Sequence, residues 1–439
     1  MTQTALLGRA RPQTPRDPFI DLLRVFGMAL VVLQHWSIPV LGFDGARLST
    51  GNALATPGVW VVTWISQVMP LVFFAGGAAN AISFRRARGN SPAWLGSRLR
   101  RLAWPLLPLA AVWIPLPHVL GALGVPEQPL ETGSRLTGQL LWFLAVYLIA
   151  VTATPYLLRL HARYGWRVPA VLGLGAVATD VLRFGTGAEM LGYANIVFVW
   201  LAVHQLGFFY VDGRLRRTGL LALAGYGAAA LLVGFGPYPG SMIGLPGAEM
   251  SNMAPPTLAM LAVSAGQIGL AVLLRPLIVR LPTERLMGWA GPRIMTVYLW
   301  HMPALFAVTG VVVVLFGVET PQPFSGGWLA GWPLWLGLLS VVMAWLLRGF
   351  ARFEEPPAVP ARELGWAAAL GAAVLVGGGL LTLTAAGFAP GIAPVAGTAA
   401  LVGGLLLTRA GRRPSAAVEP PAGPAEPPAA ERLPVSSSA

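Results

Sequence analysis

The residues best suited to chemistry in this sequence are Asp21, Arg24 and His35, which share one face of the first long apolar segment. His35 follows Arg24 by eleven residues, which in a helix is within about 20° of a whole number of turns, so the two side chains point to the same side. They are separated by roughly 16 Å along the helix axis. Asp21 lies one turn before Arg24 and is expected to pair with it. A histidine among apolar residues suits a general base, because its proton affinity is close to neutrality. The alternative is a neutral histidine that hydrogen-bonds between helices.

The composition predicts an all-α membrane protein. Of the 439 residues, 55% are hydrophobic and only 11% are charged. Apolar runs reach the length of about 20 residues that a helix needs to cross a bilayer, so we expect a polytopic helical bundle embedded in lipid. There is no cysteine and the five histidines are scattered, which argues against a thiol nucleophile and against a metal site.

Twelve apolar runs are the candidate spans. They are expected at 19–41, 57–83, 102–124, 137–158, 168–184, 194–211, 217–236, 256–274, 290–316, 328–347, 364–386 and 391–408. The fifth run is short and contains Asp180, and the last two are rich in Gly and Ala. Ten or eleven crossings are therefore alternatives to twelve.

The basic residues are all arginine, and their positions predict a topology. Arginine concentrates in the cytoplasmic loops of membrane proteins. With a cytoplasmic amino terminus, the twelve spans leave only Arg47, Arg135 and Arg183, of thirty arginines, on or near the opposite side. We therefore expect a multi-pass plasma-membrane protein with both termini in the cytoplasm. The same topology explains the net charge of +13 without a nucleic-acid partner.

Four regions follow from this organisation. We expect a cytoplasmic amino-terminal segment at 1–18, a membrane domain at 19–352, additional membrane helices at 353–408 and a tail at 409–439. The first segment is polar and leads directly into a full-length span, which predicts a retained signal anchor. The tail is rich in Pro, Ala, Glu and Ser and cannot bury a core, which predicts disorder.

The loop between the second and third spans is rich in arginine. Arg85 and Arg88 are three residues apart, as are Arg98 and Arg101, so each pair can converge on one anion. Guanidinium groups bind phosphate by paired hydrogen bonds, so this loop suits a phosphorylated cytoplasmic donor. Retention of positive charge in the cytoplasm is the alternative explanation.

Proline and glycine residues predict how the spans around this loop are shaped. Gly76 and Gly77, in the second span, allow close approach of another helix. The prolines of the third span should kink or break it and open room between helices, and they are Pro105, Pro108, Pro115 and Pro117.

Two further residues are candidates with strong structural alternatives. His301 lies well inside a predicted span, where a hydrogen bond that packs helices together is the main alternative to catalysis. Trp142 lies in the outer part of the fourth span, where an aromatic belt at the membrane interface is the obvious alternative.

Together these features resemble the acyltransferase-3 family of membrane O-acyltransferases, over about residues 17–352. The resemblance rests on the order and spacing of five motifs: D-x-x-R at Asp21 followed by R-x10-H ending at His35, an FF-small-Gly segment ending the second helix, R-x-x-R at Arg98, an LWFL-type fourth helix, and Y-L-x-H-x-P around His301. Two positions depart from the usual pattern, because Ala75 replaces a serine and Leu22 replaces a glycine.

The resemblance implies a function and a set of site residues. Family members are understood to move an acyl group, commonly acetyl, from cytoplasmic acyl-coenzyme A to a hydroxyl of a glycan or another envelope or secondary-metabolite acceptor. On this basis His35 is expected to be the catalytic histidine and Arg24 its partner, held by Asp21. Arg98 and Arg101 are expected to meet the coenzyme A phosphates. No metal is implied.

A secondary transporter or flippase is the main alternative function. It would use Asp21, Arg24 and His35 as a proton or substrate relay. Against it, the sequence shows no paired halves with matching broken helices, the repeat that many transporter folds show.

Overall fold

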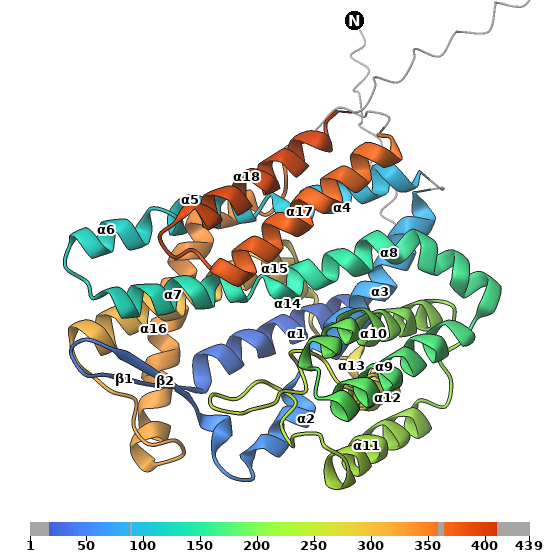
Figure 1. Ribbon diagram of the computed structural model, residues 1–439, viewed down its shortest axis with the longest axis horizontal. Helices are drawn as coiled ribbons and strands as arrows, with labels where there is room; N and C mark the ends of the chain where they lie inside the picture. Colours follow the sequence, from blue (N-terminus) through green and yellow to red (C-terminus); the bar gives the residue numbers. More distant parts are fainter. Residues whose placement is uncertain (1–16, 88–89, 359–363, 411–439) are drawn as a thin grey trace, which may run out of the picture.

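The computed structural model describes residues 17–87, 90–358 and 364–410. These residues form a helical bundle with one two-stranded sheet, and ten helical segments are long and apolar enough to cross a membrane. Most of the long helices run across Figure 1 side by side, and the β-hairpin lies at its left edge. The prediction of an all-α polytopic membrane bundle is confirmed.

In the first half of the chain the helices and strands are α1 (Pro18–Ser37), β1 (Pro39–Phe43), β2 (Leu48–Asn52), α2 (Thr63–Ser66), α3 (Met69–Arg86), α4 (Ser91–Ala103), α5 (Leu106–Trp113), α6 (Leu116–Ala122), α7 (Glu127–Gln139), α8 (Trp142–Tyr164) and α9 (Arg167–Thr186). In the second half they are α10 (Asn195–Val211), α11 (Thr218–Phe235), α12 (Leu258–Leu273), α13 (Arg275–Ile278), α14 (Glu284–Ala290), α15 (Ile294–Thr309), α16 (Gly326–Phe350), α17 (Trp366–Ala386) and α18 (Ile392–Leu407).

Each of the twelve predicted spans overlaps an apolar helix. Ten of the twelve correspond to the long segments, and the other two, α12 and α18, are shorter than a full span. Several spans are longer than predicted because short helices join end to end, as in Glu127–Tyr164, which contains α7 and α8.

The predicted end of the first span is wrong. The span was expected to reach residue 41, but α1 ends at Ser37 and the chain turns into the antiparallel hairpin of β1 and β2. Pro39 has no N–H to continue the helical hydrogen-bond ladder, which explains the stop. The apolar residues of β1 extended the hydrophobic run, so hydropathy alone did not reveal the change from helix to strand.

Proline breaks the third span, as predicted. The helix restarts twice, after Pro105 and after Pro115, and this gives the consecutive short helices α4, α5 and α6.

The glycines of α3 allow the close helix packing that was expected. A Cβ added at Gly77 would lie 2.0 Å from the His204 carbonyl oxygen on α10, and one at Gly76 would lie 2.6 Å from the Tyr147 ring on α8. Glycine is therefore required at Gly77, where backbone lies opposite, and α3 packs closely against both α8 and α10.

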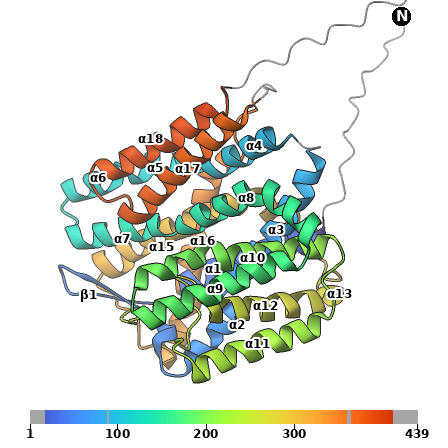
Figure 2. The ribbon, with the colours of Figure 1, turned by 45° about the vertical axis from the view of Figure 1, so that its right-hand side comes forward.

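The last two helices cover one side of the bundle. Figures 1 and 2 show α17 and α18 together with α4, α5 and α8, on the side away from α11 and α12. Helix α17 packs against α4, α7 and α8. Its end is held tightly, because a Cβ at Gly138 of α7 would lie 2.3 Å from the Leu383 carbonyl oxygen.

Two predictions fall outside this description. Most of the expected amino-terminal segment 1–18 and nearly all of the expected disordered tail 409–439 lie outside the described residues. The described chain begins at Asp17, whose carboxylate caps α1 by accepting the Phe19 N–H at 3.0 Å.

Candidate active site

Two histidines meet inside the bundle. His35, in the last turn of α1, and His301, in the middle of α15, have their Nδ1 and Nε2 atoms 2.9 Å apart. The two ring planes are inclined to each other by 24°, with centroids 5.1 Å apart. His301 is fully buried and His35 is partly exposed. The structure thus brings His35, the predicted catalytic residue, into contact with His301, for which helix packing was the main alternative to catalysis.

The hydrogen bonds of this pair determine which nitrogen of His35 is free. His301 Nδ1 lies 2.6 Å from the Tyr298 carbonyl oxygen, which can only accept, so this nitrogen carries the hydrogen. In the neutral ring His301 Nε2 must then accept, and His35 Nδ1 must donate to it. The lone pair of neutral His35 is therefore on Nε2, and this atom is the candidate general base.

Indole groups hold the helix end that carries His35. Trp36 Nε1 donates to the His301 carbonyl oxygen at 2.9 Å. On α16, Trp335 Nε1 donates to the Trp36 carbonyl oxygen at 2.8 Å, and Trp332 Nε1 donates to that of Ser37 at 3.3 Å. Carbonyl groups at a helix end have no partner within the helix, so these bonds satisfy them and fix α1 against α15 and α16.

Helix α15 is anchored at two points before His301. At its start, the Glu354 carboxylate accepts the N–H groups of Met295 at 2.8 Å and Thr296 at 2.7 Å, together with the Thr296 hydroxyl. One turn before His301, the Tyr298 hydroxyl donates to the Leu140 carbonyl oxygen at 2.5 Å. These contacts set both the depth and the rotation of α15.

The opposite end of α1 lies beside an arginine cluster formed by Arg24, Arg98 and Arg101. Asp21 and Arg24 are 3.8 Å apart on the same face of α1 as His35. On α4, Arg98 donates to the Ser83 hydroxyl and lies over the Trp94 ring, 5.6 Å from its centroid. Arg98 is within electrostatic range of both Arg24 and Arg101, so three guanidinium groups gather at this end.

A series of aromatic rings connects the arginine cluster to the histidine pair. Tyr147, on α8, is within electrostatic range of Arg98 and stacks on Phe143 with centroids 5.7 Å apart. Phe143 meets Tyr298 edge to face at 5.6 Å, and Tyr298 is 6.3 Å from the His301 ring. Aromatic side chains from α8 and α15 thus form a series of ring contacts between the two sites.

The remaining predicted arginines are placed differently. Arg85 Nη1 is 2.6 Å from Asp212 Oδ1, and the other carboxylate oxygen of Asp212 is 3.0 Å from His161 Nε2. Burial opposes ionisation of Asp212, but its hydrogen bonds to Arg85 and His161 outweigh burial and lower its pKa. Arg85 is therefore part of an ion-pair network, and Arg88 lies outside the described residues.

Trp142 lies beside the aromatic series. It is partly buried at the start of α8, with its ring centroid 6.4 Å from that of Phe143 and 6.4 Å from that of Trp200. No group of three or more His, Cys, Asp or Glu side chains that could hold a metal ion occurs among the described residues.

Sequence reasoning missed the residues that connect and orient the two sites. Tyr147 and Trp36 gave no signal beyond their apolar surroundings, and Tyr298 appeared only as the first residue of the Y-L-x-H-x-P motif. His301 is 266 residues from His35, so no local spacing pointed to their contact. The only signal was that both histidines lie inside predicted spans, where unpaired polar groups are costly and therefore seek partners.

The sequence matches one known protein family over most of its length. A family model for an acyltransferase domain, that of acyltransferase 3, matches residues 17–349. The chain belongs to the acyltransferase-3 family. A search of curated proteins and a search of solved structures each found no match. The matched region contains α1 to α15 and nearly all of α16, so the histidine pair and the arginine cluster both belong to the family domain, whereas α17 and α18 follow it.

Replacing Glu354 by Ala should loosen α15. The substitution removes three hydrogen bonds to the start of the helix. Burial raises the pKa of Glu354, because placing its carboxylate there costs desolvation free energy. This cost offsets part of the stabilisation that the three hydrogen bonds provide. We therefore expect the substitution to lower the free energy of unfolding by about 1–2 kcal/mol. Thermal unfolding in detergent measures the loss. The neighbouring exposed Glu355, replaced by Ala, is the control, and equal melting temperatures for the two variants would contradict the anchoring role.

Proposed function

We propose that this membrane acyltransferase moves an acyl group, acetyl by family resemblance, from cytoplasmic acyl-coenzyme A to a hydroxyl of an extracytoplasmic acceptor. The acceptor class is a glycan or another envelope or secondary-metabolite molecule. The single observation that carries the proposal is the His35–His301 pair, which leaves Nε2 of His35 as a base at the end of a series of aromatic rings.

Charge and distance support a donor site along α1. Arg24, Arg98 and Arg101 would bind the phosphates of coenzyme A, because guanidinium groups pair with phosphate oxygens. From Arg24 the helix rises roughly 16 Å to His35, a span suited to the pantetheine arm. The aromatic side chains of Phe143, Tyr147 and Tyr298 give this arm a largely apolar surface.

His35 would act first as a base and then as an acid. Its Nε2 takes the proton of the acceptor hydroxyl while the oxygen attacks the thioester carbonyl carbon. The tetrahedral intermediate then breaks its C–S bond, and the thiolate leaves with the proton returned by Nε2. His301 keeps Nδ1 of His35 hydrogen-bonded throughout and shares the positive charge of the imidazolium. An acyl-histidine relay would use the same Nε2 atom as nucleophile.

The topology supports transfer across the membrane. The arginine distribution in the sequence favours cytoplasmic termini and a plasma-membrane location, with the arginine cluster inside and the β-hairpin outside. Under this topology the donor enters beside Arg24, and the acceptor reaches His35 from the hairpin side.

Replacing His35 by Gln should abolish transfer without unfolding the protein. Loss of a general base costs roughly 100-fold to 10,000-fold in rate. The assay is transfer of labelled acyl groups from acyl-coenzyme A in isolated membranes without an ion gradient, followed by mass spectrometry of acyl esters. His118→Gln, at an exposed histidine of α6, is the control. Full activity of the His35 variant would refute the mechanism, and transport activity without ester formation would favour the transporter alternative.

Replacing His301 by Phe should give a smaller defect that depends on His35. The variant loses the acceptor for the His35 Nδ1 hydrogen, so the ring no longer has a fixed tautomer. We expect kcat to fall by about 10-fold to 100-fold, the donor KM to stay unchanged and the pH profile to shift. The double variant should be no slower than the His35 variant alone. Multiplicative losses would show that the two histidines act independently.

A further inference from the structure

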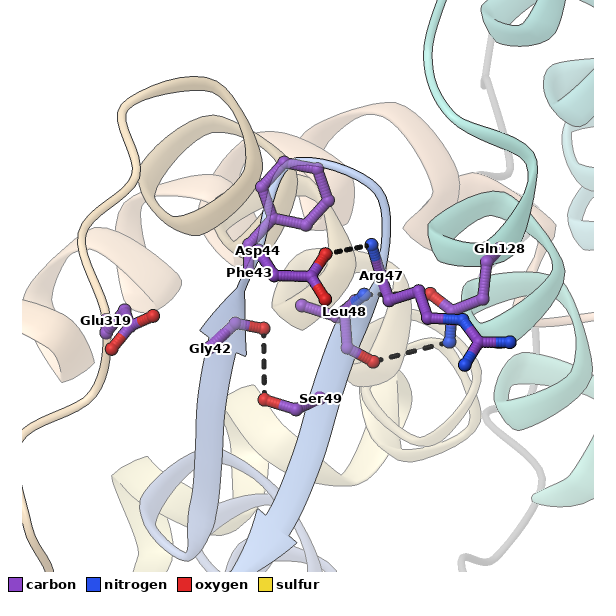
Figure 3. Close-up of a pocket in the computed structure, with 8 residues that line it drawn as sticks. All are labelled: Gly42, Phe43, Asp44, Arg47, Leu48, Ser49, Gln128 and Glu319. Carbon is purple, nitrogen blue, oxygen red and sulfur yellow. Dashed lines mark hydrogen bonds between the residues drawn. The ribbon is translucent and has the colours of Figure 1, made fainter.

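The hairpin end of the molecule contains a polar pocket that the transfer mechanism does not use. Figure 3 shows it between β1, β2, the start of α7 and the loop after α15. Its volume is about 390 Å³, and its charged or polar lining residues are Asp44, Arg47, Ser49, Gln128 and Glu319.

The pocket is built on extensions of the two helices that carry the histidines. β1 begins two residues after α1, and the loop that contains Glu319 follows α15 and its π-helical end, Gly310–Leu315. These extensions are joined, because Leu41 N donates to the Thr320 hydroxyl at 3.0 Å and Thr320 N donates to the Leu41 carbonyl oxygen at 2.8 Å. Gln128 fixes the second strand, with its side chain bonded to both backbone groups of Leu48.

Several polar groups of this pocket are open to a ligand. Asp44 accepts the Ala46 and Arg47 N–H groups through Oδ1, and these bonds lower the pKa of its carboxyl, which keeps it charged. Its Oδ2, the Glu319 carboxylate and the Arg47 guanidinium have no hydrogen bond to another side chain among the described residues. All three residues line the pocket, and Figure 3 shows Asp44 between Glu319 on one side and Arg47, which extends toward Gln128, on the other.

The mixture of charges excludes two classes of ligand. A bound metal ion would meet only two carboxylates, with a guanidinium beside them, and a phosphate would be repelled by Asp44 and Glu319. A neutral polyhydroxylated ring fits better. The carboxylates accept from hydroxyls, as does the Ser49 hydroxyl oxygen, whose hydrogen is donated to the Gly42 carbonyl oxygen, while Arg47 donates and the apolar face of the ring can lie on Phe43.

We propose that this pocket, defined by Asp44, Arg47 and Glu319, is a remote subsite that holds one sugar unit of an extended saccharide acceptor. From His35 the chain rises through two helical and about five extended residues to Gly42, a path of at most about 20 Å. A unit held here leaves a neighbouring unit of the same chain free to reach His35. The acceptor role rests on the proposed function, whereas binding does not.

The test uses the full protein in nanodiscs with glucose oligomers and N-acetylglucosamine oligomers of one to five units. Saturation-transfer NMR measures their binding to the Arg47→Ala/Glu319→Gln variant and to wild type. The control, Arg135→Ala/Glu131→Gln, removes the same two charges from an ion pair on α7. We expect the pocket variant to bind the longer oligomers at least tenfold more weakly and the control to bind them as wild type does.

Other outcomes would overturn the subsite. No oligomer binding by wild type, equal binding by the pocket variant, or displacement of a bound oligomer by inorganic phosphate or Ca²⁺ would each contradict it. The same measurements on His35→Gln separate the two proposals, because that variant should bind oligomers without acyl transfer. If wild type binds but never acylates them, the proposed function fails. If it acylates them with an unchanged KM in the pocket variant, the subsite fails.

Discussion

The hydrogen bond between His35 and His301 is the interaction on which the site depends. Two uncharged imidazoles inside a membrane bundle satisfy each other only in one tautomeric arrangement, because the Tyr298 carbonyl oxygen takes the hydrogen of His301 Nδ1. The surrounding contacts maintain this geometry. Indoles of Trp36 and Trp335 tie α1 to α15 and α16, and Glu354 fixes the start of α15.

Under the proposed function, the same geometry would separate two chemical tasks along α1. Donor phosphates would bind at the amino-terminal end, where Arg24 and the arginines of α4 influence one another, and proton transfer would occur near the carboxyl-terminal end at His35. Helix α3 packs closely against α8 and α10 at Gly76 and Gly77, where an added Cβ would meet the Tyr147 ring and the His204 backbone. In the proposed mechanism, a thioester donor and a hydroxyl acceptor would then meet at His35 from opposite ends of α1.

The sequence predicted what depends on local pattern. Apolar runs gave the helical spans, proline gave the breaks around α5, and the shared face of Asp21, Arg24 and His35 survives because α1 is unbroken. Prediction from the sequence failed where the structure depends on contacts between distant residues or on a short apolar strand. The hairpin after Ser37 looked like continued helix, the partner of His35 lies 266 residues away, and Arg85 pairs with Asp212. Hydropathy contains no information about such pairings.

The most direct test of the account is to locate a donor in the protein. A cryo-electron microscopy map of the protein in nanodiscs with a non-reactive thioether analogue of acetyl-coenzyme A would show where the phosphates and the thioether lie. The account predicts phosphate density at Arg24, Arg98 and Arg101, with the thioether carbon beside His35 Nε2. Density for the analogue elsewhere, such as the pocket lined by Asp17, Tyr210 and Arg275, would contradict it.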